Sequence, residues 1–352
     1  MNKAINKQEK IKLFDPNAIG DAANNLFGLP FNCDEAEVVV IPVPWEVTVS
    51  YSSGTAKGPA AIFNASLQVD LFDPLLPDAW KKGIAMQEIP QEWEKKNKIL
   101  RKKAERYIHL LEQGENDKQA EMLLIKKEIN DACSTLNTWV KNTALAYLNN
   151  NKLVVLIGGD HSTPLGLMQA MAEKYPTFGI LQIDAHADLR DAYEGFKFSH
   201  ASIMFNVLKI KQVEKLVQVG IRDYCEAEVD IINKSKGRIV TFFDKNIKHQ
   251  LFEGNTWNKI CEDIIHQLPQ YIYLSFDIDG LDPKLCPNTG TPVVGGFEAE
   301  QVLYLLEKIV QAKKKIIAFD INEVAPGATE WDANVAARLL YRISNIAMLS
   351  RS

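Results

Sequence analysis

Short apolar runs rich in β-branched and aromatic residues recur along the chain, and most are continuous rather than alternating. A continuous apolar run predicts a strand buried on both faces, as in a parallel sheet covered by helices. Helical periodicity appears between the runs, at 163–175 and 298–315. Strands that alternate with helices predict an α/β fold with a mainly parallel, doubly wound sheet. The apolar runs lie at 37–43, 152–158, 178–184, 215–221, 237–243, 271–277 and 315–321.

Residues 91–150 differ from the rest because they are charged and helical, without strand patterns. Two apolar faces repeat at helical spacing, and the sequence QGEND lies between them. We therefore expect a helical hairpin, which either covers the sheet or forms an oligomer contact or lid. The chain, 1–352, is taken as one domain with this extension. The apolar faces comprise Leu100, Ala104, Tyr107, Ile108 and Leu111, and then Met122, Ile125, Ile129, Leu136 and Val140.

Composition narrows the function classes. The chain has 352 residues, 46% of them hydrophobic, and a net charge of −5 with acidic and basic residues well mixed. We expect no nucleic-acid partner, which would require a basic stripe. Because the chain starts with polar residues and has no long apolar run, we expect no signal peptide and no membrane span. Five scattered cysteines without a CxxC pair are typical of reduced thiols in a cytoplasmic protein.

The segment LQIDAHADLR places two carboxylates and an imidazole directly after a buried strand. Asp184, His186 and Asp188 stand at every second residue, so their side chains share one face of an extended backbone. Buried carboxylates this close repel each other unless a cation compensates their charge. The spacing therefore indicates a metal site, with a solvated turn as the alternative.

Two further strand ends carry similar groups. His161 follows the strand in VVLIGGDHS, and Asp277 and Asp279 follow the one in YIYLSFDIDG. Ligands of open α/β sheets bind beyond the carboxyl ends of the strands, so these groups should meet at one rim. When ionised, the four aspartates carry a total charge of about −4, which two divalent ions would balance. Carboxylate and imidazole ligands without thiolate favour Mn²⁺, with Ni²⁺, Co²⁺ or Fe²⁺ possible.

Several ordered blocks resemble the ureohydrolases, the family of arginase and agmatinase. GGDHS, DAHAD and SFDIDGLDP are similar to the three signature motifs of that family. The resemblance extends from about Glu37 to the C-terminus, and 91–150 stands out as an extension. Three more blocks carry it: GTAKGPAAI (54–62), TGTPVVGG (289–296) and AFDINEVAP (318–326).

The resemblance implies a three-layer α/β/α sandwich, a homotrimer or homohexamer, and two Mn²⁺ ions. It also implies hydrolysis of a guanidino C–N bond, with release of urea, by a hydroxide that bridges the metals. Asp184 and Asp277 would bridge the two ions. The matching ligands would be His161, Asp184, Asp188 and Asp277 for one ion, and Asp184, His186, Asp277 and Asp279 for the other.

The resemblance assigns roles to further residues. Glu323 matches the family's guanidinium-binding glutamate, and Thr291 matches a threonine at the same end of the pocket. His200 matches the proton-shuttle histidine, and an ordinary pKa near 6.5 suits that task. We predict His200, Glu323 and Asp188 as catalytic residues. The alternatives are a salt bridge for Glu323, turn chemistry for Thr291 and a packing role for His200.

The loop DLRDAYEGFKFSHASIM departs from the arginase, agmatinase and formimidoylglutamase patterns. Arg190 stands where arginases carry asparagine two residues after the last ligand. Facing the pocket, Arg190 would bind an acidic tail and repel an ammonium unless Asp191 or Glu194 neutralised it. The alternative is that Arg190 faces away from the pocket. A pocket closed by Trp45 or Trp331 would suit free guanidine.

We therefore expect an agmatinase-like enzyme that acts on a small guanidino substrate. The close alternatives are a guanidine or guanidino-acid hydrolase, followed by formimidoylglutamase or arginase. A non-catalytic, metal-stabilised scaffold is the alternative of a different class, and a deacetylase-like binuclear hydrolase is a third.

Overall fold

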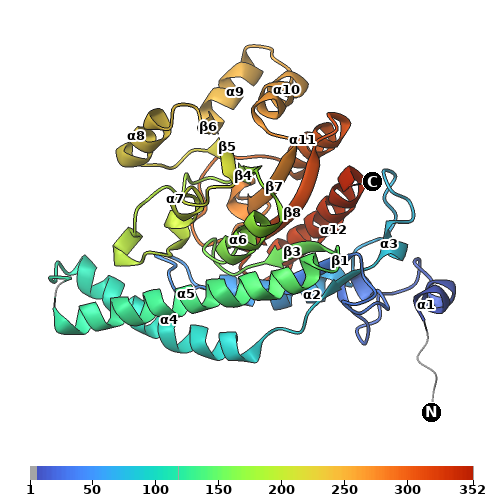
Figure 1. Cartoon of the computed structure of the whole chain (residues 1–352), viewed down its shortest axis with the longest axis horizontal. Coiled ribbons are helices and arrows are strands. Elements are labelled where there is room, and N and C mark those ends of the chain that lie inside the picture. The colour runs from blue at the N-terminus through green and yellow to red at the C-terminus, as the bar shows by residue number, and fades with distance from the viewer. Residues whose placement is uncertain (1–5, 118, 352) are drawn as a thin grey trace.

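One sheet of eight parallel strands forms the centre of the computed structural model, which describes residues 6–117 and 119–351 (Figure 1). The strand order is β2-β1-β3-β8-β7-β4-β5-β6. The first three strands of the chain thus form one side of the sheet, β4, β5 and β6 form the other, and the last two, β7 and β8, lie in the middle. All seven predicted strands are confirmed. The sequence missed β2, because a run of three residues is too short to show a pattern. The bounds are β1 Val38–Pro42, β2 Ile84–Met86, β3 Leu153–Ile157, β4 Phe178–Ile183, β5 Val213–Ile221, β6 Ile239–Phe243, β7 Tyr271–Asp277 and β8 Lys315–Asn322.

Twelve α-helices of the described chain surround the sheet. The predicted helices at 163–175 and 298–315 correspond to α6 and α11. None of the described helices combines the length and apolar character that a bilayer crossing needs. The bounds are α1 Lys7–Leu13, α2 Gly58–Ser66, α3 Ala79–Lys82, α4 Gln91–Glu112, α5 Ala120–Leu148, α6 Leu165–Lys174, α7 Ile203–Val207, α8 Glu226–Lys234, α9 Asp244–Phe252, α10 Trp257–Gln267, α11 Ala299–Gln311 and α12 Trp331–Arg351.

Each face of the sheet carries its own hydrophobic core. In β3, Val155 and Ile157 belong to the core that contains residues of α2, α11 and α12. Their neighbours Val154 and Leu156 point to the other face and join the core that contains residues of α4, α5 and α6. Alternate residues of one continuous apolar strand thus serve two cores, as expected for a sheet covered on both sides. The predicted three-layer α/β/α sandwich is confirmed.

The extension at 91–150 forms the predicted hairpin of α4 and α5, which lie side by side as the two longest helices in Figure 1. Gly114 has a φ of 78° just after α4. Its amide donates to the Leu111 carbonyl, and the Glu115 amide donates to the Leu110 carbonyl. These bonds satisfy the last carbonyls of the helix and turn the chain back. The helix α5 of this hairpin packs on the rest of the molecule, where it contacts α6 and the strands β1 and β3.

The contact between α5 and α6 depends on a close backbone approach at Gly166. A Cβ atom at this position would lie 2.3 Å from the Asn137 carbonyl oxygen and 2.7 Å from the Val140 Cβ. A side chain of any size would therefore push the two helices apart. The hairpin reaches the rest of the molecule partly through this contact.

We predict that Gly166→Ala lowers the free energy of unfolding by about 1–3 kcal/mol through overpacking. Helix propensity alone would favour alanine by about 1 kcal/mol, so a net loss isolates the steric effect. Urea denaturation measures the change. Asn142→Ala, on the exposed face of α5, is the control and should stay within about 0.5 kcal/mol of the wild type. Equal or higher stability of Gly166→Ala would contradict the prediction.

Candidate metal centre

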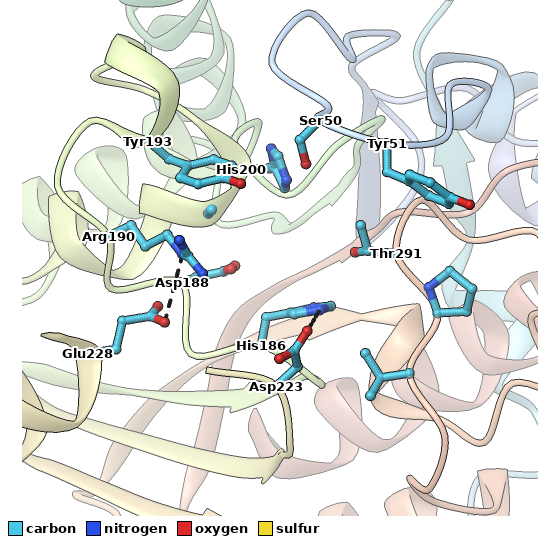
Figure 2. Close-up of a pocket in the computed structure, with 13 residues that line it drawn as sticks. Ser50, Tyr51, His186, Asp188, Arg190, Tyr193, His200, Asp223, Glu228 and Thr291 are labelled. Carbon is cyan, nitrogen blue, oxygen red and sulfur yellow. Dashed lines mark ion pairs between the residues drawn. The ribbon is translucent and has the colours of Figure 1, made fainter. Parts of the chain in front are cut away.

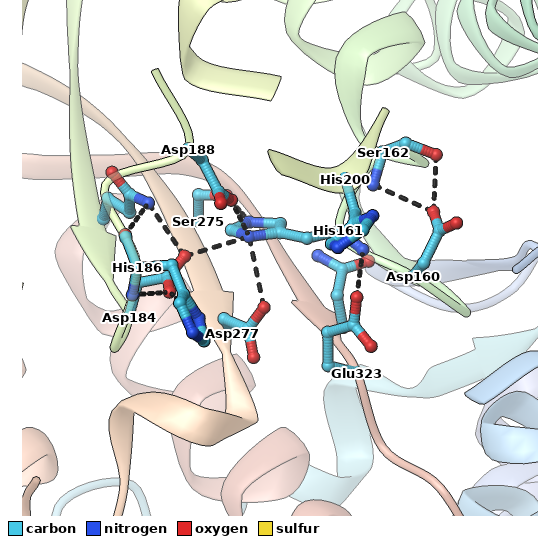
Figure 3. Close-up of polar contacts among 12 residues, drawn as sticks. Asp160, His161, Ser162, Asp184, His186, Asp188, His200, Ser275, Asp277 and Glu323 are labelled. Atoms are coloured by element: carbon cyan, nitrogen blue, oxygen red, sulfur yellow. Dashed lines mark hydrogen bonds and ion pairs between the residues drawn. The ribbon is translucent and has the colours of Figure 1, made fainter. Parts of the chain in front are cut away.

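The predicted ligands lie at the carboxyl ends of three strands that are close together in the middle of the sheet. His161 follows β3, Asp184 follows β4, and Asp277 is the last residue of β7. Glu323 follows β8, which runs between β3 and β7. Parallel strands present their carboxyl ends at one rim, so segments far apart in the sequence meet there. The structure therefore brings Glu323 to the same region as the predicted metal ligands, of which Figure 3 shows all but Asp279.

The side chain of His161 is surrounded by three aspartates. Its Nδ1 lies 3.0 Å from Asp184 Oδ2, 3.0 Å from Asp188 Oδ2 and 3.2 Å from Asp277 Oδ2. Despite these short distances, this buried Nδ1 makes no hydrogen bond within the described chain. Oxygen and nitrogen atoms that converge without hydrogen bonding are the arrangement a cation requires. These residues fit a divalent metal ion.

A second group forms around His186. Its Nδ1 lies 3.0 Å from Asp279 Oδ2 and 3.7 Å from Asp184 Oδ1. Asp279 Oδ2 is buried and likewise has no hydrogen-bond partner among the described residues. Asp184 belongs to both groups, so two metal-binding sets share one carboxylate. The six predicted ligands thus lie together, and their metal-binding role stays a prediction.

The electrostatics of the cluster favour added positive charge. Burial and the charge of Asp184 raise the pKa of Asp188 to about 7. Burial and neighbouring carboxylates also raise the pKa values of Asp184 and Asp277. Burial opposes protonation of His161, but the three surrounding aspartates raise its pKa well above the ordinary value. Without a cation the cluster therefore retains protons, and a divalent ion would displace them.

The atoms of the candidate ligands are oriented by polar residues inside the strands, which the sequence interpretation missed. His161 Nε2 lies 2.9 Å from Ser275 Oγ, and this hydroxyl donates to Asp320 Oδ1 at 3.1 Å. A proton on Nε2 would leave the Nδ1 lone pair free for a metal. Gln182 donates to Asp184 Oδ2 at 2.8 Å. A polar residue inside a continuous apolar strand was the sequence feature that could have pointed to these supporting residues.

Glu323 has one oxygen engaged and one free. Oε1 accepts a hydrogen bond of 2.9 Å from the His161 amide. Oε2 is buried and has no hydrogen-bond partner in the described part of the chain. Burial, followed by the charge of Asp277, raises the pKa of Glu323 well above its ordinary value. A cationic group at Oε2, such as a guanidinium, would favour the ionised carboxylate and supply the missing hydrogen bond.

Two residues of the centre have unusual backbone conformations. Asp188 and Glu323 have φ angles of 55° and 62°. Residues other than glycine rarely occupy this left-handed region, and such outliers cluster at functional sites. Both residues follow the ends of central strands, where the turn directs their side chains into the cluster.

A cavity of about 420 Å³ opens beside the ligands. Its wall includes the predicted residues Arg190, His200 and Thr291 (Figure 2). Trp45 is fully buried against Trp93, and Trp331 donates to the Lys284 carbonyl. Neither tryptophan lines the cavity, so the condition under which free guanidine would suit the pocket is not met. The other lining residues are Ser50, Tyr51, His186, Asp188, Tyr193, Ala201, Asp223, Glu228, Pro292 and Val293.

His200 faces this cavity from the loop after the ligands. Its amide donates to Thr48 Oγ1 at 3.2 Å, which fixes the backbone. Burial, followed by the nearby His186, lowers the pKa of His200 to about 3. The imidazole is therefore neutral at pH 7, and its pKa lies well below the value near 6.5 on which the proton-shuttle prediction rests.

Arg190 is neutralised by a residue that the sequence interpretation did not consider. Its Nε lies 3.9 Å from Glu228 Oε2, and its guanidinium stacks over Tyr193 at 4.7 Å from the ring centroid (Figure 2). Glu228 is buried and accepts hydrogen bonds from the Leu189 and Cys225 amides. The ion pair expected for Asp191 or Glu194 is therefore formed by Glu228. The sequence did not reveal Glu228 as the partner of Arg190, because Glu228 occupies an ordinary capping position of α8.

Comparisons with known proteins agree with this geometry. The model of the arginase family matches residues 36–344. The N(1)-aminopropylagmatine ureohydrolase of Thermus thermophilus is 30% identical over 308 residues, which cover 88% of this chain and 89% of that protein. The agmatinase of Bacillus anthracis is 26% identical over 293 residues, 83% of this chain and 85% of the relative. The solved proclavaminate amidino hydrolase of Streptomyces clavuligerus superposes with a TM-score of 0.72 at 21% identity, covering 95% and 100% of the two chains.

We predict that a divalent cation raises the thermal midpoint of the protein, because it relieves repulsion among the buried carboxylates. At about 100-fold over its Kd the rise should be roughly 5 °C. Asp277→Asn should reduce this rise without lowering the metal-free midpoint, since it removes one of the repelling charges. Differential scanning fluorimetry with and without MnCl₂ measures both values.

The control is Asp230→Asn, at an exposed carboxylate of α8 paired with Lys234. It should keep the full metal-induced rise. Equal rises for Asp277→Asn and the wild type would show that Asp277 does not hold the cation.

Proposed function

The chain belongs to the arginase family of hydrolases, which act on guanidino C–N bonds, and we propose that it releases urea from a guanidino compound with a cationic tail. The reaction converts a substituted guanidinium ion and water into urea and an ammonium ion, so atoms and charge balance. The proposed label is agmatinase-like.

The ion pair between Arg190 and Glu228 is the observation that favours a substrate with a cationic tail. Because Glu228 lies 3.9 Å from Arg190, the repulsion that Arg190 would exert on a substrate ammonium is largely cancelled. Asp223 then adds an exposed carboxylate to the cavity wall, and the rings of Tyr51 and Tyr193 offer faces to a cation. The relatives named for aminopropylagmatine and agmatine have substrates that end in amines, which supports the same choice.

Cavity size supports a substrate longer than guanidine itself. About 420 Å³ lies within the range of small-molecule sites and leaves room for an extended tail. Free guanidine would fill little of this space. An acidic tail would require Arg190 to leave Glu228, which is held in place by two backbone amides.

We further propose that two divalent ions occupy the cluster, with Mn²⁺ as the natural pair and Ni²⁺ as the alternative. Bound there, such ions would make water nucleophilic near neutral pH. Asp184 and Asp277 would be shared between the ions. The proposal also includes the homotrimer or homohexamer that the family resemblance implies. One ion would be held by His161, Asp184, Asp188 and Asp277, and the other by Asp184, His186, Asp277 and Asp279.

The remaining residues would bind the substrate and move a proton. Glu323 Oε2 would accept hydrogen bonds from the guanidinium. Thr291 lines the cavity and follows Gly290, at which an added Cβ would lie 2.9 Å from Glu323 Oε2. Attack of water on the guanidinium carbon forms a tetrahedral adduct that must lose an amine. His200, which faces the cavity, would accept a proton from this adduct and donate it to the departing amine.

We expect the Mn²⁺-loaded protein to release urea fastest from agmatine or aminopropylagmatine, compared with arginine, guanidine, 3-guanidinopropionate and 4-guanidinobutyrate. His200→Ala should slow the reaction by about 10²–10⁴-fold, the usual value of general acid–base help. A colorimetric urea assay measures both. His266→Ala, at an exposed position of α10, should leave the rate unchanged. No urea from any of these compounds would refute the proposed function.

Substrate charge preference should depend on Glu228. In Glu228→Gln, Arg190 loses its counter-charge, so the ratio of kcat/KM for agmatine to that for 4-guanidinobutyrate should fall by about tenfold, equivalent to about 1.4 kcal/mol. Glu226→Gln, an exposed change in the first turn of the same helix, is the matched control. An unchanged ratio for Glu228→Gln would mean that Arg190 does not influence the tail.

A further inference from the structure

The loop at 46–54 forms part of the cavity wall without regular secondary structure of its own. Ser50 and Tyr51 from this loop line the cavity, whereas Val47, Thr48 and Val49 are fully buried. Buried backbone groups outside helices and strands need other hydrogen-bond partners. The source of those partners determines how firmly this wall is held.

Arg101 of α4 supplies them from the helical hairpin. Its Nη1 donates to the carbonyls of both Val47 and Val49, the former at 3.3 Å. Its Nε donates at 3.1 Å to Ser53 Oγ and to Glu105 on its own helix. Only 10% of this side chain is exposed, so its charge-assisted hydrogen bonds are shielded from water. A guanidinium can reach separate acceptors in this way, whereas an ammonium is a single point.

The two carbonyls that Arg101 holds flank Thr48, which joins two parts of the centre. Thr48 Oγ1 donates to Asp160 Oδ2 at 3.1 Å and accepts from the His200 amide at 3.2 Å. Asp160 precedes the candidate ligand His161. A displacement of Thr48 would therefore reach His200 on one side and the loop of His161 on the other.

The base of the same loop has a second tether to α4. Asn97 Oδ1 accepts from the Glu46 amide at 2.7 Å. Glu46 Oε2 in turn accepts from the amides of Gly54 and Ala56, at 2.6 and 3.1 Å, and closes the loop. Trp93 packs edge-on against Trp45 just before the loop, with ring centroids 5.8 Å apart.

The hairpin also holds the opposite wall of the cavity. Asn130 of α5 donates to the Gly195 carbonyl at 3.3 Å and accepts from the Lys197 amide at 2.7 Å. Tyr107 of α4 packs on Phe196 with ring centroids 5.1 Å apart. The residues that the hairpin contacts here, 195–197, lie in the segment that connects Arg190 to His200. Both walls are thus fixed to the same pair of helices.

We propose that the α4–α5 hairpin positions the walls of the active-site cavity, and that Arg101 is the positioning residue for the loop at 46–54. This assignment gives the extension a purpose beyond covering the sheet. Its catalytic consequence rests on the proposed function, but the positioning itself does not.

Amide hydrogen exchange of the full chain, read by mass spectrometry, tests the inference with Arg101→Met. Methionine keeps much of the apolar volume and removes the donors. We expect exchange at 46–54 and 199–202 to rise at least about tenfold, with β4 and β7 unchanged. The matched control is Arg106→Met, at an exposed residue of the same helix paired with Glu121, and it should leave both segments unchanged.

In the Mn²⁺-loaded enzyme, Arg101→Met should lower kcat/KM by about 10–100-fold, because small misplacements of the wall misalign the substrate. Metal content should be unchanged. Arg101→Lys should restore part of the exchange protection, and it replaces Arg101→Met in the comparison if the latter does not fold. Asn130→Ala should raise exchange at 193–199 alone.

Unchanged exchange at 46–54 in a folded Arg101 variant would overturn the inference, as would an equal rise across the whole chain. A wild-type protein that releases no urea would refute the proposed function only, since the exchange comparison needs no turnover. An active wild type with unaltered exchange in the Arg101 variants would refute the inference only.

Discussion

Mutual repulsion among buried carboxylates is the constraint on which the rest of the structure depends. Asp184, Asp188 and Asp277 surround one imidazole nitrogen at about hydrogen-bonding distance, yet they leave it without a hydrogen bond. Such a cluster is unfavourable in a flexible chain, because the charges would separate. It persists here because each group follows a central strand that is packed on both faces. The apolar cores thus supply the stability with which the charged centre is held together.

Support for the centre is arranged in two tiers. The inner tier consists of polar residues within the strands, such as Ser275 and Gln182, which orient individual ligand atoms. The outer tier is the α4–α5 hairpin, which holds the cavity walls through Arg101 and Asn130. The inner tier contacts the candidate metal ligands, and the outer tier contacts the walls of the cavity. Changes in the outer tier would therefore act first on the cavity walls, and they would reach the loop of His161 through Thr48 and Asp160.

The sequence was informative where a local pattern has one physical meaning. Alternation of Asp184, His186 and Asp188 after an apolar run fixes a common face, and continuous apolar strands fix the layers. It failed where partners are distant and chemically ordinary. Glu228 has the spacing of a helix cap, so nothing marks it as the partner of Arg190. Arg101 lies in a charged helix and resembles a solvated residue, because its loop partners lie 52 and 54 positions away. The short β2 had too few residues for any periodicity.

The separation of the site residues along the chain also constrains the order of events in biogenesis. The hydrogen bond from the His161 amide to Glu323 spans 162 positions, and the ligands come from three crossover units. Contacts of such long range close late, since the loop entropy must be overcome first. The candidate ligands therefore come together only after the central strands have assembled. A metal ion that binds these residues would therefore report correct topology late in folding, and it would stabilise the finished fold without templating it.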